Sequence, residues 1–375
     1  MKRLLYLVLV LVLMVSWFLE NQHYVQHKES LGYSNLEKAR ENFFNQYDSS
    51  ETKVKIPNYR QKEEFNSWIR KYLVHKKFLN PKDTLKDILV SEAIKKFQNY
   101  HGLDPDGLVG PKTHAALKIP GKVLYRKMII NMERWKSDRI EDSCYILINI
   151  PSFTLSVINN NKVDLKFKVI VGLPNWKTPV LYSKVTSVIF NPYWYVPHSI
   201  AVKEVIHDIK NDHNYLTRNN FRVINYKNQA VDPRSIDWAR VNAYNFNYTL
   251  RQDPGVGNAL GVVKFIFPSP YSIYMHDTPS KQLFESDNRA LSHGCIRLEK
   301  PMELLTYLYE NKFLLTDMDS IQVLIQGYKN YRVTLNKTIP IYIGYYTCEA
   351  DAQGNLFFYD DIYKKDENLI KMIFE

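Results

Sequence analysis

Cysteine is scarce in this chain, with three residues among 375. Three thiols cannot form the disulfide framework that holds small secreted domains together, and an odd number leaves at least one thiol unpaired in a monomer. Cys144 and Cys348 lie in apolar runs, where we expect small buried side chains, with a disulfide between them as an open alternative. Cys295 has a polar setting and is treated separately below.

Motifs for several large function classes are also missing. The sequence has no glycine-rich phosphate loop of the kind found in nucleotide hydrolases, and no helix-turn-helix, zinc-finger or RNA-binding signature. The formal net charge is nevertheless +11, which attracts anionic lipids and wall polymers as well as nucleic acids. Because those recognition signatures are missing, we predict no nucleic-acid partner despite this charge. The hydrophobic content of 45% is enough for a substantial core, and the length suggests two or three structural units.

The start of the chain has the pattern of an export segment. Lys2 and Arg3 precede an uncharged apolar run over residues 4–19, which Glu20 ends. As a helix this run would be about 24 Å long, short against a bilayer core of about 30 Å, and no A-x-A-like cleavage site follows it. We predict an uncleaved signal anchor over residues 1–22, in the inner membrane, with the bulk of the chain in the periplasm; a cleaved signal is the alternative.

The next part of the chain is polar and then helical. Residues 23–80 contain helix-like pieces and are interpreted as a juxtamembrane stalk or small helical scaffold. Residues 81–120 are predicted to form a small all-α unit, because apolar residues recur there every three or four positions. A turn rich in Gly, Asp and Pro over residues 102–111 separates its helices, and Pro120 stops the last one.

From about residue 143 the pattern changes to short apolar or alternating runs separated by turn residues. This predicts a mainly β domain with a few helices over residues 143–325. Residues 195–258 form a long excursion between strands, and excursions of that length are usually functional lids or binding loops. Residues 326–375 are expected to pack on this domain as a C-terminal extension.

The residues that carry chemistry lie between positions 274 and 298. His276 ends an apolar strand, and Cys295 closes a Ser-His-Gly-Cys sequence at residues 292–295. A thiol attacks only as a thiolate, so a nucleophilic cysteine needs an imidazole that takes its proton. We predict His276 as this base, because the glycine between His293 and Cys295 indicates a tight turn that separates those two side chains.

Neighbouring groups complete the predicted site. The backbone N–H groups of Gly294 and Cys295 are expected to form an oxyanion hole, and Arg297 to bind a substrate carboxylate and favour the thiolate. One alternative is that Cys295 is a buried structural cysteine; another is a zinc site formed by His276, His293 and Cys295. Structural zinc sites use four closed ligands with C-x-x-C-like spacing, which is missing here, so no metal is predicted.

The segment resembles the signature of the L,D-transpeptidase (YkuD) catalytic domain, which is a His, a variable spacer, Ser/Thr-His-Gly-Cys, an apolar residue and Arg or Asn. The spacing from His276 to Cys295 is 19 residues. Residues 172–174 with 178–179 resemble the family's segment after its early strands. Further pieces resemble the larger subclass with a capping subdomain, at residues 191–197, 251–255, 258–261 and 339–346. Residues 81–120 independently resemble a small three-helix peptidoglycan-binding domain, through residues 93–98, 102–103, 106–107 and 110–113.

This resemblance implies a YkuD-like β-sandwich with a helical and loop capping subdomain, and a peptidoglycan cross-linking activity without cofactor. Cys295 would attack the third residue of a tetrapeptide stem, and His276, oriented by the Asp277 carbonyl, would protonate the departing D-Ala. The thioester would pass to the side-chain amine of another stem, giving a 3→3 cross-link. Carbapenems would acylate the same thiol. The expected substrate-binding residues are Arg297, Ser292, His293, Tyr274, Trp194 and Asp277.

The implied partner is therefore peptidoglycan, with other wall synthases as further candidates. The same thioester has two other outcomes, since water would give an L,D-carboxypeptidase and a protein lysine would give lipoprotein attachment. An alternative from another class is a wall-binding scaffold whose catalytic domain is inactive; the paired His276 and Cys295 argue against it.

Overall fold

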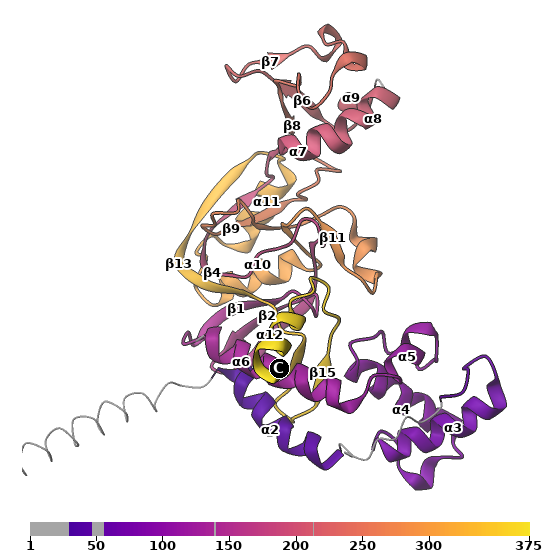
Figure 1. Cartoon of the computed structure of the whole chain (residues 1–375). Helices are drawn as coiled ribbons and strands as arrows, with labels where there is room; N and C mark the ends of the chain where they lie inside the picture. The colour runs from indigo at the N-terminus through magenta and orange to yellow at the C-terminus, as the bar shows by residue number, and fades with distance from the viewer. Residues whose placement is uncertain (1–29, 47–55, 139, 213) are drawn as a thin grey trace, which may run out of the picture.

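The computed structural model describes residues 30–46, 56–138, 140–212 and 214–375, and the signal anchor predicted over residues 1–22 lies outside these ranges. No helix in the described ranges is long and apolar enough to span a membrane. The chain forms a β domain in the middle, a small cap at one end and a helical unit beside the other end (Figure 1).

The predicted mainly β domain is confirmed. Within the described residues it has a nine-stranded sheet with the order β11-β3-β12-β10-β9-β4-β13-β1-β2, and β2 also pairs with β3, so the sheet closes on itself. Because β3 is long, it pairs with β2 along most of its length and with β12 and β11 near its end. The strands are β1 (Cys144–Asn149), β2 (Thr154–Asn159), β3 (Lys162–Gly172), β4 (Leu181–Phe190), β9 (Val263–Ile266), β10 (Met275–His276), β11 (Ala290–Ser292), β12 (Ile296–Leu298) and β13 (Tyr331–Gly344).

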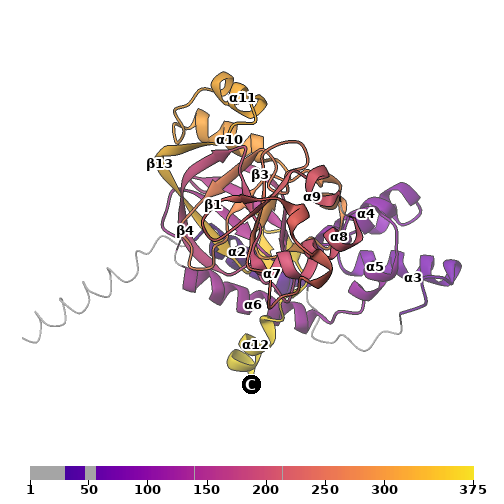
Figure 2. The ribbon, with the colours of Figure 1, turned by 90° about the horizontal axis from the view of Figure 1, so that it is seen from above.

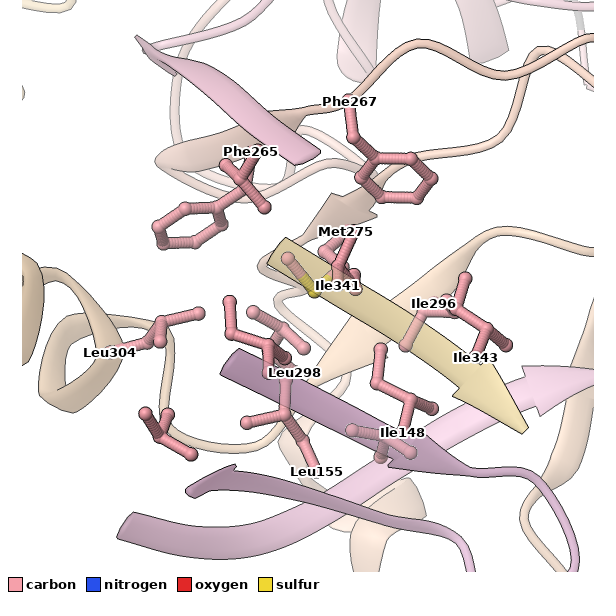
Figure 3. Packing of buried hydrophobic residues seen from close by; sticks show 14 of the residues in the cluster. Ile148, Leu155, Phe265, Phe267, Met275, Ile296, Leu298, Leu304, Ile341 and Ile343 are labelled. Carbon is pink, nitrogen blue, oxygen red and sulfur yellow. The ribbon is translucent and has the colours of Figure 1, made fainter. Parts of the chain in front are cut away.

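The core lies inside this closed sheet. Met275 of β10 is paired with Phe265 on one neighbouring strand and with Ile296 on the other, and all three side chains are fully buried. Figure 3 shows them packed with aliphatic side chains from the other strands and with Leu304 of α10 (Pro301–Glu310). Since successive strand residues point to opposite faces, the residues between these core positions face outward. The outward face of β9, β10 and β12 carries the site described below.

The C-terminal residues are part of the sheet as well as a cover for it. The sheet continues past the predicted boundary at residue 326, because β13 pairs in parallel with β1 and antiparallel with β4. After it come a hairpin, β14 (Cys348–Ala350) and β15 (Leu356–Phe358), and helix α12 (Asp366–Phe374). Two helices, α2 (Leu31–Gln46) and α6 (Gly121–Asp138), share a second core with this hairpin and β1. Trp135 stacks on Tyr346 in that core, with ring centroids 3.7 Å apart.

The helical unit begins earlier than the predicted boundary at residue 81. Helix α3 (Lys62–His75) shares one core with α4 (Asp87–Tyr100) and α5 (Pro111–Ala116), because Phe65, Ile69 and Leu73 lie along one face of α3 and are buried against the other two helices. The buried Gln98 side chain holds the turn between α4 and α5, since its amide donates to Leu108 O at 2.8 Å and accepts from Gly107 N at 2.8 Å. A short 3₁₀ helix, η1 (Pro81–Asp83), links α3 and α4.

The excursion predicted over residues 195–258 folds into a small cap with its own core. In the described residues its sheet has the order β5-β8-β6-β7, and helices α7, α8 and α9 lie beside it (Figure 1); Figure 2 shows these helices from above. The chain leaves the closed sheet after β4 and returns at β9. The elements are β5 (Trp194–Tyr195), α7 (His198–Ile200), the π-helix η2 (Ala201–Val205), α8 (Ile206–Asn211), α9 (Tyr215–Arg218), β6 (Phe221–Ile224), β7 (Ala230–Val231), η3 (Pro233–Ser235), η4 (Trp238–Arg240) and β8 (Thr249–Gln252). The remaining helices are η5 (Lys281–Glu285) and α11 (Met318–Gln326).

Candidate active site

Cys295 lies on a tight turn between β11 and β12. The Ser292 hydroxyl donates to the Cys295 carbonyl oxygen at 2.6 Å and accepts from the Gly294 N–H at 3.1 Å. Gly294 has φ +113°, a conformation that side-chain-bearing residues rarely adopt, which explains the glycine before the cysteine. The turn is therefore fixed by its own residues.

A second set of hydrogen bonds supports this turn from behind. The Thr178 hydroxyl, which is fully buried, donates to Gly294 O at 2.8 Å and accepts from Gly172 N at 2.9 Å. The Tyr363 hydroxyl donates to Gly172 O at 2.6 Å and accepts from Thr178 N at 3.1 Å. The C-terminal extension thus holds the backbone that positions the residue before Cys295.

His276 is buried at the end of β10, with 5% of its surface exposed. Its Nδ1 lies 2.5 Å from the Asp277 carbonyl oxygen. A carbonyl only accepts hydrogen bonds, so Nδ1 carries the proton and Nε2 is left as the acceptor. The Asp277 carboxylate is itself held by Val262 N at 3.0 Å and by Lys281 Nζ at 2.7 Å. The expected contact between the His276 ring and the Asp277 carbonyl is therefore present, and its orienting role in catalysis stays a prediction.

The strand register gives His276 a basic neighbour on each side. Lys264 on β9 and Arg297 on β12 are its direct cross-strand partners. Directly opposed residues on adjacent strands share a face, so the three side chains form a row on the outward face of the sheet. Tyr274 and Cys295 immediately precede their strands, one step along the same register.

Lys264 has no counterpart in the sequence predictions. Its Nζ lies 3.5 Å from the centroid of the Tyr274 ring, a cation–π contact, and that ring lies 5.6 Å from the His276 ring. Among the described residues, neither Lys264 nor Arg297 has a hydrogen-bonded acidic partner. The site therefore contains two cations that are available to an anion.

Burial keeps the cysteine and the histidine neutral. The pKa of Cys295 is raised from its ordinary value by burial, which outweighs the lowering by hydrogen bonds from Tyr274 and by the charges of Lys264 and Arg297. Burial, together with the nearby Arg297 charge, lowers the pKa of His276 to about 3. The expected favourable effect of Arg297 on the thiolate is present, but at neutral pH the unliganded pair is a thiol and a neutral imidazole.

The second histidine of the motif is engaged by the cap. His293 Nε2 lies 2.6 Å from Glu204 Oε1 on η2, and its ring centroid lies 4.3 Å from that of Trp176. The preference for His276 as the base agrees with this arrangement, since His293 is bonded elsewhere. Glu204 and Trp176 were not expected near the turn, because they come from segments far from it in the sequence.

Family comparisons can now be set beside this geometry. Residues 143–325 match the family model described as the L,D-transpeptidase catalytic domain, YkuD. This part of the chain is similar to the YkuD family. Residues 64–117 match a second family, described as "Putative peptidoglycan binding domain", which agrees with a helical unit that includes α3.

Among the relatives of the L,D-transpeptidase domain is a Haemophilus influenzae protein named "Putative L,D-transpeptidase". It is 35% identical over 225 residues, which cover 60% of this chain and 45% of the relative, so the match spans less than half of that protein. Similar solved structures include an L,D-transpeptidase from Stackebrandtia nassauensis, at 12% identity and TM-score 0.28, covering 75% of this chain and 90% of the other. The catalytic domain of an Enterococcus faecium L,D-transpeptidase has 13% identity and TM-score 0.25, with 54% and 98% covered.

Several predicted site residues of the β domain are hydrogen-bonded or packed within the protein. The Gly294 N–H is bonded to Ser292, so it is not free for an oxyanion; the Cys295 N–H has no acceptor among the described residues. Ser292 is buried, and its hydroxyl is hydrogen-bonded within the turn. The Asp277 carboxylate accepts hydrogen bonds from Val262 N and Lys281 Nζ. Trp194 packs on the core of the cap, with its ring 6.1 Å from Phe221. Ser292 and Asp277 are therefore hydrogen-bonded within the protein, and substrate contact by these three side chains stays a prediction.

The remaining alternatives from the sequence concern metal and disulfides. In the described ranges, no three His, Cys, Asp or Glu side chains converge in a way that could hold a metal ion. Cys144, Cys295 and Cys348 are all free thiols. Cys348 is fully buried in the core shared with α2 and α6, and the Cys144 sulfur lies 3.7 Å from the Tyr307 hydroxyl.

Proposed function

We propose that the protein is an L,D-transpeptidase that forms 3→3 cross-links in peptidoglycan, with Cys295 as nucleophile and His276 as the group that takes and returns its proton. The observation that supports this most is the fixed tautomer of His276, whose Nδ1–H is bonded to the Asp277 carbonyl. His276 belongs to β10, which pairs with β12, the strand that follows Cys295 directly. The match of residues 64–117 to a peptidoglycan-binding family supports a wall substrate and a site of action in the envelope.

In the first half-reaction the pair starts neutral. As Cys295 Sγ forms a bond to the carbonyl carbon of the third stem residue, its proton passes to Nε2 of His276. The electron pair of the carbonyl moves to its oxygen, and we assign the Cys295 N–H and the Tyr274 hydroxyl, which bonds the thiol, as its hydrogen-bond donors. When the bond to the terminal D-Ala breaks, His276 returns the proton to the leaving amine, and a thioester remains.

The two cations beside the pair lower the cost of this charge separation. Lys264 and Arg297 both favour the charged form of the Cys295 sulfur. Because His276 is neutral, it supplies no resting positive charge to the thiol, and we assign that role to Lys264. Arg297 is assigned to a stem carboxylate, since its guanidinium has bidentate geometry and forms no ion pair in the described chain, although the Glu204 charge acts on it.

The second half-reaction uses the same groups in reverse. The side-chain amine of a diamino acid from another stem attacks the thioester carbonyl, and His276 Nε2 takes the amine proton. The carbon–sulfur bond breaks, and the thiolate recovers its proton from His276. Transfer requires that water be kept away from the thioester. The cap reaches the Cys295 turn through the contact between Glu204 and His293 and is the segment assigned to this shielding.

The proposal is tested with purified protein and disaccharide tetrapeptides, with products identified by mass spectrometry. We expect cross-linked dimers that have lost one D-Ala, no dimers with Cys295→Ala, and unchanged dimer formation with Cys144→Ala, a matched cysteine variant away from the turn. Tripeptides without dimers would identify a carboxypeptidase instead. Dimer formation by Cys295→Ala would rule out the proposed nucleophile.

A further inference from the structure

A second concave site lies behind the turn that carries Cys295. It is a groove of about 500 Å³ between helix α6, the loop that follows β3, and the start of α12. Figure 1 shows α6 and α12 next to each other at the end of the β domain opposite the cap. The lining residues are Arg134, Asp138, Lys177, Val180, Tyr345, Tyr363, Lys364, Lys365, Asn368 and Leu369.

The lining has four cations and one carboxylate, and the acidic groups in and beside the groove are already occupied. Asp138 accepts from the Tyr346 hydroxyl, and burial raises its pKa. Asp366 pairs with Arg134 at 2.8 Å. Asp361 accepts from the Tyr345 hydroxyl at 2.6 Å and from the Lys365 backbone N–H at 2.8 Å. Among the described residues, none of these carboxylates forms an ion pair with a lysine side chain of the groove, although the charge of Asp361 acts on Lys365.

In the described residues, the three lysines of the groove form no ion pair with a carboxylate; Glu367, whose charge is felt at Lys364, pairs with Lys371. Lys177 donates one hydrogen bond, to the Tyr363 carbonyl at 3.2 Å. The Lys365 ammonium lies 5.2 Å from the Tyr345 ring centroid and has no hydrogen-bond acceptor in the described chain, as is also true of Lys364. Burial and the charges of Arg134 and Lys177 lower the pKa of Lys365. A bound anion would remove this unfavourable interaction between like charges.

The other walls of the groove suit a peptide more than a small ion. Tyr345 and Tyr363 present aromatic surface, and Val180 is 41% exposed at the rim with Leu369 nearby. These groups would contact aliphatic parts of a chain, while the ammonium groups bind its oxyanions. Tyr363 is also the residue whose hydroxyl holds Gly172 and Thr178, and Thr178 in turn holds Gly294. A peptide in the groove would thus lie against the support of the catalytic turn.

We propose that this groove binds a carboxylate-bearing stem peptide of peptidoglycan, at a site separate from the thiol. The proposal rests on the function proposed above, because that function makes peptidoglycan stem peptides the ligands of this protein. Lys177 and Lys365 are the residues that bind the carboxylates, with Lys364 at the rim. The site would hold a neighbouring stem of the same wall while one stem reacts at Cys295.

The test uses the full chain with Cys295→Ala, so that no turnover occurs. The dissociation constant of a disaccharide tetrapeptide is measured by calorimetry for this protein, for the same protein with Lys177→Gln and Lys365→Gln, and for a control with Lys312→Gln and Lys329→Gln. Both control lysines are exposed, and replacing them removes the same total charge as the two groove substitutions. Two further ligands are the same muropeptide with amidated carboxyl groups, and inorganic phosphate. Thermal unfolding shows whether every variant is folded.

We expect the groove variant to bind the tetrapeptide about tenfold more weakly, as loss of two charge-assisted contacts implies, and the control to bind as before. The amidated ligand should bind both proteins equally weakly. Equal affinity of the groove variant and the control would overturn the proposal. Binding of phosphate at these lysines without competition from the tetrapeptide would overturn the assignment to a stem peptide. Dimer formation by the wild-type protein is measured separately, and its failure would count against the proposed function, whereas the groove is judged on binding alone.

Discussion

Replacing Thr178 with valine tests whether the support behind the catalytic turn acts as described. Valine has nearly the same shape, so the substitution removes a hydroxyl and leaves the packing in place. The lost hydroxyl is fully buried and bonds both Gly294 O and Gly172 N. Each of these backbone groups would be left buried without that partner, at a cost of about 1–3 kcal/mol. We expect the free energy of unfolding of the β domain to fall by about 2–4 kcal/mol.

The same change should slow acylation, because Gly294 precedes the nucleophile. A displacement of a reacting group by about 1 Å can cost about 100-fold in rate. Denaturant unfolding gives the stability, and intact-protein mass spectrometry of the acyl-enzyme gives the rate. Thr178→Ser keeps the hydroxyl and should recover most of the acylation rate. Thr249→Val is the matched control, since Thr249 is exposed on β8. If Thr178→Val were no less stable than this control and acylated at the wild-type rate, the support described for the turn would be wrong.

Charge and burial at the site lead to further outcomes. Alkylation of Cys295 by iodoacetamide should rise about tenfold per pH unit through neutral pH, because burial raises the thiol pKa above its ordinary value of 9.0; a plateau below pH 7 would instead show a stable thiolate–imidazolium pair. Lys264→Gln should slow alkylation at pH 7 about tenfold, and an unchanged rate would remove Lys264 from the mechanism. The free energy of unfolding should fall as the pH drops from 6.5 toward 3, by up to about 1.4 kcal/mol per unit for each of His276 and His101, since burial lowers both pKa values to about 3 and only the unfolded chain takes up the protons. Above pH 6.5 these two groups do not make the free energy of unfolding depend on pH. If urea unfolding gave the same free energy of unfolding between pH 6.5 and 3, the burial of both histidines as neutral groups would be contradicted. Deleting residues 62–117 should weaken binding to sacculi much more than it slows turnover of free muropeptides; equal losses would make this unit part of the catalytic fold.

Much of the fold follows from periodicity in the sequence. The alternation around Val263, Lys264 and Phe265 predicts a strand with one buried face, and β9 has that arrangement. The apolar residues Phe65, Ile69 and Leu73 of α3 have helical spacing, but the sequence does not place them in the helical unit. They stand among lysines and glutamates, a composition equally typical of a polar stalk, and only packing against α4 and α5 separates the two interpretations.

The site was predictable where its residues are close in sequence. Cys295 and His276 belong to one motif, and its chemistry suggested their pairing before the fold was known. Lys264 and Tyr363 come from other strands and loops, and their places depend on strand register, which local patterns do not give. The Gly294 N–H was assigned to the oxyanion because a glycine before a nucleophile favours that role, but the Ser292 hydroxyl reaches it first.

The most direct test of the central claim is the mass of the protein after brief incubation with a disaccharide tetrapeptide. The account predicts an adduct equal to the muropeptide minus D-Ala, located on Cys295 by digestion and absent from Cys295→Ala. It should form much more slowly in His276→Ala than in His293→Ala. An adduct on Cys144 or Cys348, or equal rates for the two histidine variants, would contradict the proposed pair of nucleophile and base.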